Sequence, residues 1–231
     1  MQYEKKVGRP TADASAELTQ RITQVATQVF LEKGYANAGM EEISSISGVA
    51  KRSLYSRFPN KALLFCHVMK SYSDQAFEGL DGNPCRELTL EQQLGAACLQ
   101  ILRSLMKPPV ATMQRVITGE AARFPELAQS LIHARSRFLE YIASILHGSA
   151  PCEDITPDKL QCAAGFLFDM VITPEIHRAA LGLVPCEVTE TTAQKVEWGV
   201  KLFLRGFLQM HCSQQAACGT EPPPLPPPAA D

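Results

Sequence analysis

Apolar residues recur every three or four positions over most of the 231-residue chain, a spacing that favours α-helix. Leu18, Ile22, Val25 and Val29 mark a first helix, which Gly34 is expected to end. No pair of alternating strand patterns is joined by an Asn-Gly or Asp-Gly hairpin. The pattern therefore predicts an all-α protein.

Proline, glycine and capping residues divide the rest of the chain into further helices. Asn60 is a suitable N-cap, and Thr156-Pro157-Asp158 and Thr173-Pro174-Glu175 each have the order expected at a helix start. After the first helix, helices are predicted over about residues 40–46, 51–58, 61–79, 90–106, 110–122 and 125–148, in two segments opening at Pro157 and Pro174, and over 189–211.

The last predicted helix carries a heptad pattern of apolar residues, and a shorter stripe of the same kind precedes it. We interpret the two stripes as the surfaces through which two copies of the chain form a four-helix dimer interface. The alternative is that both stripes belong to the core of one chain. The predicted interface residues are Leu160, Ala164, Leu167, Val171, Val196, Val200, Phe203 and Phe207.

Charge is unevenly distributed along the chain. Residues 1–70 hold ten Lys or Arg against six Asp or Glu, a balance of +4, and the remainder must carry −6 to give the total of −2. A basic first third is typical of a module that binds a polyanion, although ordinary surface scatter is the alternative. The N-terminus has no apolar run and no stretch is long enough to span a membrane, so we expect a cytoplasmic protein without a membrane partner.

The eight cysteines are scattered and form no Cys-x-x-Cys pair, so no metal site is expected. Cys212 and Cys218 are close enough in sequence for a redox switch, and inert thiols are the alternative. The motifs of phosphate-binding loops, serine hydrolases and zinc proteases are missing. We therefore predict no cofactor and no enzymatic activity.

The most informative segment runs from Gly34 to Phe65. It contains two short predicted helices separated by a turn at Gly48, with Val49 and Leu54 placed to anchor them, as a helix-turn-helix requires. The second helix then presents cations and hydroxyl groups, and a major groove accepts one such helix. These groups belong to Lys51, Arg52, Ser53, Tyr55, Ser56 and Arg57.

Three parts of this segment resemble the TetR family of bacterial transcriptional regulators. They are Gly34-Tyr35, Met40-Glu41-Glu42-Ile43, and the run from Gly48 to Phe65 with its Leu54-Tyr55, Phe58-Pro59 and Lys61. The resemblance covers roughly residues 17–77. It implies a homodimer with an N-terminal three-helix DNA-binding domain and a larger helical C-terminal domain that binds a small molecule and dimerises.

The resemblance also implies a domain organisation and a function. We expect a flexible basic arm (1–14), a helix-turn-helix domain (15–65) whose fourth helix (61–79) leads to a ligand-binding and dimerisation domain (80–212), and a Pro-rich disordered tail (213–231). The implied function is repression through a pseudo-palindromic double-stranded DNA operator, with release by a small apolar or amphipathic effector.

Roles for individual residues follow from the same resemblance. Tyr55 would place its hydroxyl on a phosphate, Lys61 would bind a backbone phosphate at a helix N-terminus, and Arg57 would read a guanine edge or hold a phosphate. For Tyr55 and Lys61 the alternatives are packing and solvation. The predicted DNA-binding residues are Arg9, Gly39, Met40, Lys51, Arg52, Ser53, Tyr55, Ser56, Arg57 and Lys61.

Two positions depart from the family pattern. The family usually has Ser or Thr where this chain has Gly39 and Ala50, and alanine supplies no side-chain cap. Binding would then depend more on Lys51, Arg52 and the arm, whose Gly8-Arg9-Pro10 is typical of minor-groove contacts, with a solvated tail as the alternative. A dimeric ligand-binding protein without DNA binding, or a transcriptional activator, are the alternative functions.

In the C-terminal part, the segment Glu120 to Ala128 resembles one that recurs in TetR C-terminal domains, where it marks a helix junction and identifies no ligand. Aromatic and methionine side chains are predicted to line an effector pocket, with His133 or Tyr141 as its polar group, and plain core is the alternative. The predicted pocket residues are Met106, Met113, Phe124, His133, Phe138, Tyr141, Phe166 and Phe168.

Overall fold

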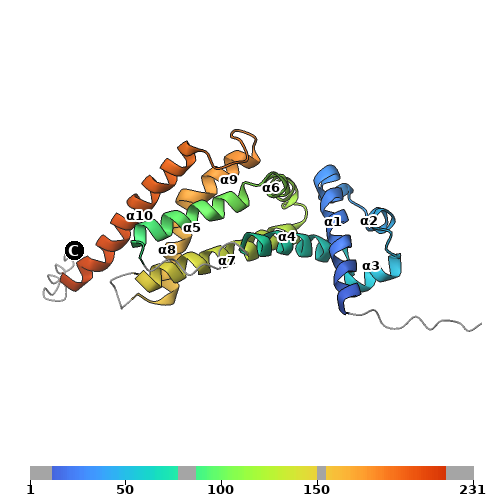
Figure 1. Cartoon of the computed structure of the whole chain (residues 1–231), viewed down its shortest axis with the longest axis horizontal. Coiled ribbons are helices and arrows are strands. Elements are labelled where there is room, and N and C mark those ends of the chain that lie inside the picture. The colour runs from blue at the N-terminus through green and yellow to red at the C-terminus, as the bar shows by residue number, and fades with distance from the viewer. Residues whose placement is uncertain (1–11, 78–86, 150–154, 217–231) are drawn as a thin grey trace, which may run out of the picture.

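The computed structural model of the chain describes residues 12–77, 87–149 and 155–216, which form helices and loops without a strand. The predicted all-α fold is confirmed. A bundle of α1 (Ala12–Asn37), α2 (Met40–Ser47) and α3 (Lys51–Arg57) stands at one end of an elongated molecule (Figure 1). The other helices are α4 (Lys61–Phe77), α5 (Leu90–Leu105), α6 (Pro108–Glu120), α7 (Pro125–Ser149), α8 (Pro157–Leu167), a π-helical turn η1 (Phe168–Ile172), α9 (Thr173–Ala180) and α10 (Glu190–Ala216).

The turn between α2 and α3 is built from local hydrogen bonds around Gly48. Gly48 has φ 64°, a left-handed conformation that glycine adopts without steric cost. The buried Ser44 donates its hydroxyl to the Val49 carbonyl at 2.6 Å, and the Val49 N–H donates back to the Ser44 carbonyl at 3.2 Å. Val49 and Leu54 lie in the core. These contacts set the angle between α2 and α3.

Helix α1 differs from its predicted end. It bends at Gly34, where φ is 74°, and helical turns continue to Asn37. The backbone of Tyr35 and Ala36 is thereby turned toward α6, and a Cβ at Gly34 would lie 3.0 Å from a carboxylate oxygen of Glu120. Glycine is therefore needed here both for its φ angle and for the close approach.

Two apolar cores divide the molecule. The first lies under α1 to α4 and also includes Met113 and Ile117 of α6 and Leu127 of α7. The second lies between α5, α7, α8 and α10. Because α6 and the start of α7 contribute to the first core, the N-terminal helices are packed on the C-terminal ones. The predicted boundary between residues 15–65 and 80–212 stays a prediction.

The segment from Pro157 to Ala180 differs from the two separate helices predicted. It is one continuous run, with the π-helical turn η1 immediately before Thr173. Pro174 has no backbone N–H, so it cannot donate the i to i−4 bond to Met170, and a wider turn precedes it. Helix α9 therefore begins at Thr173 with Pro174 in its first turn, as predicted, but it continues directly from η1.

The predicted dimer stripes lie inside the single chain, which corrects the sequence-based assignment. Phe203 is half-buried and the other seven side chains are buried: Leu160, Ala164, Leu167, Val171, Val196, Val200 and Phe207. Val171 packs against Gly199 so closely that a Cβ at Gly199 would lie 2.8 Å from it. Both stripes therefore belong to the core of one chain, which was the alternative interpretation.

Candidate nucleic-acid interface

Helix α3 presents most of its polar side chains to solvent. Leu54 is fully buried and fixes the helix on the core, which leaves the opposite face open. Lys51, Arg52 and Ser56 are exposed, and Tyr55 is 43% exposed. Ser53, also predicted at the interface, is half-buried. The exposed face therefore offers two cations and hydroxyl groups, the groups that contact bases and phosphates.

Lys51 is paired within the chain in this structure. Its Nζ lies 2.6 Å from a carboxylate oxygen of Glu41 on α2, and both side chains are exposed. An exposed pair of this kind contributes about 0 to 1 kcal/mol, so a phosphate can replace Glu41 at little cost. Arg52 has no intramolecular ion pair among the described residues.

At the N-terminus of α2, the side chain of Met40 differs from the predicted DNA-binding role. Gly39 and Ala50 are the N-caps of α2 and α3, and neither has a side chain that accepts a hydrogen bond from the helix backbone. Met40 is only 9% exposed and belongs to the core, so its side chain is not presented for DNA contact. Gly39 and Met40 can then offer only backbone N–H groups. Arg9 lies outside the described residues.

Arg57 is turned away from the exposed face of α3. Its Nη1 donates to the Thr19 hydroxyl at 2.6 Å and its Nη2 to the Ser15 hydroxyl at 2.9 Å. Both partners lie on α1. Arg57 therefore anchors the end of α3 on α1, and a contact with a guanine or a phosphate would require these bonds to be released.

Lys61, at the start of α4, is held by the end of α1. Its Nζ donates to the carbonyls of Tyr35, Ala36 and Ala38 at 2.7, 3.0 and 3.1 Å, and it lies 4.6 Å from the centre of the Tyr35 ring. Burial lowers the pKa of Lys61. Because an ammonium group has three N–H donors, all of them are used inside the chain.

The same stretch of α1 is held from the other side by two carboxylates that sequence analysis did not select. Glu120, at the end of α6, accepts hydrogen bonds from the backbone N–H groups of Tyr35 and Ala36 at 2.9 and 2.8 Å. Glu126, in the first turn of α7, accepts one from the Tyr35 hydroxyl at 3.2 Å. Burial, and next the hydrogen bond to Glu126, raise the pKa of Tyr35. We call these contacts, together with Lys61, the junction between the N-terminal and C-terminal helices.

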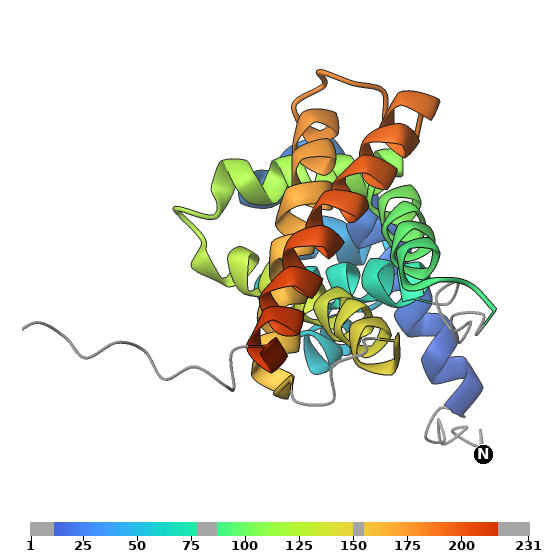
Figure 2. The same cartoon turned by 90° about the vertical axis from the view of Figure 1, so that its left-hand side faces the viewer.

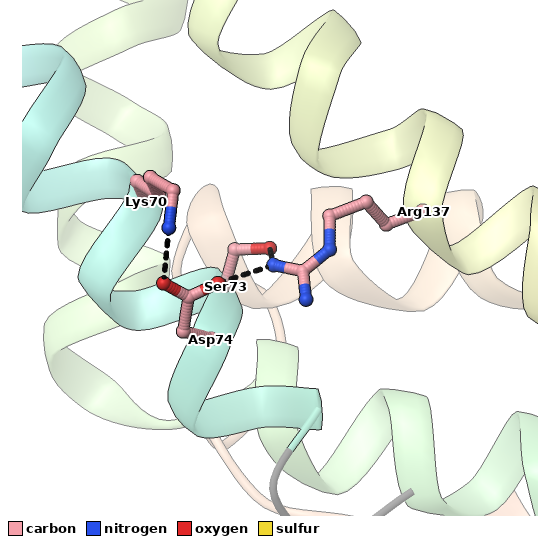
Figure 3. A network of polar contacts seen from close by, with 4 residues as sticks. All are labelled: Lys70, Ser73, Asp74 and Arg137. Atoms are coloured by element: carbon pink, nitrogen blue, oxygen red, sulfur yellow. Dashed lines mark hydrogen bonds and ion pairs between the residues drawn. The ribbon is translucent and has the colours of Figure 1, made fainter. Parts of the chain in front are cut away.

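A groove of about 290 Å³ lies between α4 and α7. At its wall, Lys70 donates to Asp74 at 2.7 Å, and Arg137 donates to Asp74 and Ser73 (Figure 3). The hydrogen bond from Lys70, supplemented by that from Arg137, holds the pKa of Asp74 below its ordinary value. His133, a predicted pocket residue, lines this groove.

A second cavity of about 250 Å³ lies between α7, η1 and α9, and Phe138 and Phe168 are in its wall. The other predicted pocket residues lie elsewhere. Met106 and Met113 are buried in the two cores, and Phe124 packs edge-on to the Tyr35 ring. Tyr141 is half-buried against the C-terminal core, and Phe166 is 67% exposed. The predicted pocket therefore splits into two cavities and several core positions.

Other chemistry is limited in the part of the chain that the structure describes. No group of His, Cys, Asp or Glu there could hold a metal ion, and no helix there is long and apolar enough to cross a membrane. Burial raises the pKa of the Cys98 thiol to about 12. Cys218 and the side chain of Cys212, the predicted switch, lie outside the described residues.

A helix-turn-helix with an exposed cationic second helix, joined to a larger helical part with cavities, defines a DNA-binding regulator of transcription. Residues 22–68 match the family of bacterial regulatory proteins called the tetR family. Residues 92–208 match the C-terminal domain of AefR-like transcriptional repressors. The chain belongs to the TetR family, as the sequence predicted.

Curated relatives are also regulators of this type. SrpR of Pseudomonas putida is 26% identical over 141 residues, which are 61% of this chain and 64% of SrpR. The activator FasR of Mycolicibacterium smegmatis is 38% identical over 55 residues, which are 24% of this chain and 25% of FasR. The chain thus spans less than two thirds of the length of each of these two relatives.

Solved structures match over most of their length. A TetR-family regulator from Mesorhizobium loti is 25% identical, with a TM-score of 0.69 over 85% of this chain and 98% of its own. The flavonoid-responsive regulator FrrA is 25% identical, with a TM-score of 0.68 over 83% and 97%. The arrangement of both parts of the molecule is therefore shared with known TetR-family proteins.

Proposed function

We propose that the chain is a homodimeric repressor that binds a pseudo-palindromic operator and is released by a small molecule. The observation that carries this proposal is the open face of α3, where Lys51, Arg52, Ser53, Tyr55 and Ser56 are available for a major groove. Lys51 and Tyr55 contact phosphates and Arg52 reads base edges.

The proposed dimer interface uses a different set of residues from the buried stripes. Apolar side chains remain exposed on α8 with η1 and on α10, which pack side by side at the end of the molecule remote from α3 (Figure 2). Trp198 is 69% exposed and Leu202 lies four positions further along the same helix. The exposed residues are Phe166, Met170, Trp198 and Leu202. A second copy covering this surface forms a four-helix interface and removes the patch from water.

Ligand release is proposed to run through the junction. The 250 Å³ cavity is lined by residues of α6 and α7, and the same helices end or begin at Glu120 and Glu126, which hold Tyr35. A ligand that favours another position of α6 or α7 would shift α1 and with it the helix-turn-helix. FrrA, whose name describes it as responsive to flavonoids, supports a small-molecule effector.

Repression is favoured over activation by the extent of the matches. The match to the activator FasR covers only 55 residues. The match to the C-terminal domain of AefR-like repressors covers residues 92–208. The more extensive match is to the C-terminal domain of repressors, and it supports repression.

The test is selection of duplexes from a random-sequence pool by the purified full chain, followed by titration of the selected duplex at several salt concentrations. We expect tight, salt-dependent binding that Arg52→Ala weakens by about 1 to 3 kcal/mol with relaxed base preference. Arg103→Ala, at an exposed position of α5, is the matched control and keeps wild-type binding. Failure to enrich any sequence would favour the ligand-binding protein without DNA binding.

A further inference from the structure

The cavity between α7, η1 and α9 has an apolar wall with one arginine in it. Its volume is about 250 Å³. Leu131, Phe138 and Phe168 provide much of the apolar surface, and Arg135 and Asp169 are the charged residues of the lining. A mostly apolar cavity with a few polar groups is the usual form of a small-molecule site.

Arg135 has one buried donor atom that lacks a partner in the described part of the chain. Its Nη2 donates to Asp169 at 2.7 Å, and its guanidinium carbon lies 5.4 Å from the centre of the Phe168 ring. Its Nε is buried and has no hydrogen-bond partner among the described residues. A buried N–H without a partner is unfavourable, so a shift of the Arg135 side chain that brings this N–H to an acceptor on a ligand would be favourable.

The acidic partner of Arg135 is hydrogen-bonded at both of its oxygens. One carboxylate oxygen of Asp169 accepts from Arg135 and the other from the Thr173 hydroxyl at 2.9 Å. Among the described residues, the buried polar side-chain atom of this cavity that lacks a partner is therefore a donor on a cation, and it is complementary to an anion.

The groove between α4 and α7 lacks this feature. Its cations Lys70 and Arg137 both bind Asp74, and Arg137 also donates to Ser73. No side-chain N or O atom of this groove is buried without a partner in the described part of the chain. The unpartnered donor thus distinguishes the cavity at Arg135.

We propose that the cavity at Arg135 binds an anionic amphipathic molecule, with its aromatic or aliphatic body against Phe138 and Phe168 and its carboxylate or sulfonate on Arg135. This inference rests on the proposed function, because the molecule bound here is the effector that releases the proposed repressor from its operator. Arg135 approaches Gly165 of α8, where a Cβ would lie 3.9 Å from Nη2, so α8 as well as α7 borders the bound anion.

The test compares two fluorescent probes that differ only by an acidic group: anilinonaphthalene sulfonate and the uncharged phenylnaphthylamine. Wild-type protein is expected to bind the sulfonate about ten-fold more tightly than the amine, at one site per chain. Arg135→Gln removes this preference and leaves the affinity for the amine within about two-fold. Arg103→Gln, at an exposed position on α5 that lines none of these cavities, keeps the preference.

A second variant keeps the test decisive if Arg135→Gln does not fold. Asp169→Asn removes the competing carboxylate and is expected to tighten binding of the sulfonate at least about two-fold. If the Arg135 and Asp169 pair only holds α7 to η1, Asp169→Asn weakens or leaves unchanged the binding of both probes, which overturns the inference. Equal affinity of the wild type for both probes overturns it too.

Operator binding is measured on the same preparations. Operator binding without a preference for the sulfonate overturns this inference and leaves the proposed repressor standing. A preference for the sulfonate without operator binding supports the anion site and contradicts the proposed function as a repressor. Release of the operator by the sulfonate in the wild type, but not in Arg135→Gln, supports both.

Discussion

The carboxylate of Glu120 accepts the backbone N–H of Tyr35 at 2.9 Å, and this bond joins residues 85 positions apart in the chain. Its second oxygen accepts the N–H of Ala36 at 2.8 Å. These two N–H groups follow the bend at Gly34, where regular helical geometry is interrupted. One side chain of α6 thus completes the hydrogen bonding at the end of α1, and any displacement of α6 acts directly on the DNA-binding bundle.

Replacing Glu120 by Ala is expected to lower the free energy of unfolding by about 1 to 3 kcal/mol, because two backbone donors lose their acceptors. Amide hydrogen exchange at Tyr35 and Ala36 should accelerate more than elsewhere in α1. Glu140→Ala, at an exposed position on α7, is the control and should stay within about 0.5 kcal/mol of the wild type. Unchanged exchange at Tyr35 in Glu120→Ala would show that the bond has no influence on this junction.

Features that depend on neighbouring residues were predictable from the sequence. The αL turn at Gly48 and the cap from Asn60, whose Oδ1 accepts the Leu63 N–H at 2.9 Å, are decided within a few positions. The contacts of Lys61 and Glu120 were not predictable, because their partners are 23 to 85 positions away. A pattern of local spacing contains no information on such pairs.

The faces of α10 show a second limit of sequence reading. Val196 and Val200 form an apolar stripe that is buried in the chain, while Trp198 and Leu202 form another that is exposed. Both stripes have helical spacing, so periodicity identifies a helix with two apolar faces but does not say which face packs within the chain. Only the positions of α5, α8 and η1 against α10 separate the core face from the exposed one.

Lys61→Met separates a structural role from a phosphate contact. We expect a loss of about 1 to 3 kcal/mol in the free energy of unfolding, since three carbonyls lose a charged donor. The salt dependence of operator binding, measured well below the unfolding temperature, should keep its wild-type slope. Lys51→Met is the matched variant. It should leave the free energy of unfolding within about 0.5 kcal/mol of the wild type. It should lower the slope of the logarithm of the operator-binding constant against the logarithm of the salt concentration by about one. A reduced slope in Lys61→Met would instead assign a phosphate to Lys61.

Stability should fall in mild acid through His67, which packs on the Phe58 ring at 5.1 Å between centroids. Burial, and next the charge of Lys70, lower the pKa of His67 below 6.5, although Asp74 acts in the opposite direction. The unfolded chain therefore binds a proton at a higher pH than the folded chain does, so the stabilisation is present above pH 6.5 and is lost as the pH falls from there to the folded pKa.

The measurement is the urea midpoint between neutral and mildly acid pH for the wild type and for His67→Gln. Because one proton is involved, the free energy of unfolding of the wild type and that of His67→Gln can differ in their dependence on pH by at most about 1.4 kcal/mol per pH unit. His133 and Arg137 of α7 line the same groove. His133→Gln, at another histidine of this groove, is measured in parallel as the control. Parallel curves for the wild type and His67→Gln would mean that another group is responsible.

Trp198→Glu is expected to convert the proposed dimer to a monomer, because it places a charge on the exposed apolar face of α8, η1 and α10. Trp198 is 69% exposed in the single chain, so the substitution should change the free energy of unfolding of the monomer little, within about 0.5 kcal/mol. Sedimentation velocity over a range of protein concentrations measures the change. Operator binding should weaken with it, since a two-fold operator requires two linked helix-turn-helix units.

Leu88→Glu, at an exposed apolar position preceding α5, is the control and should remain dimeric. If Trp198→Glu sediments as the wild type does while Leu88→Glu dissociates, the interface lies on the side of α5 and the assignment to α8 and α10 is wrong.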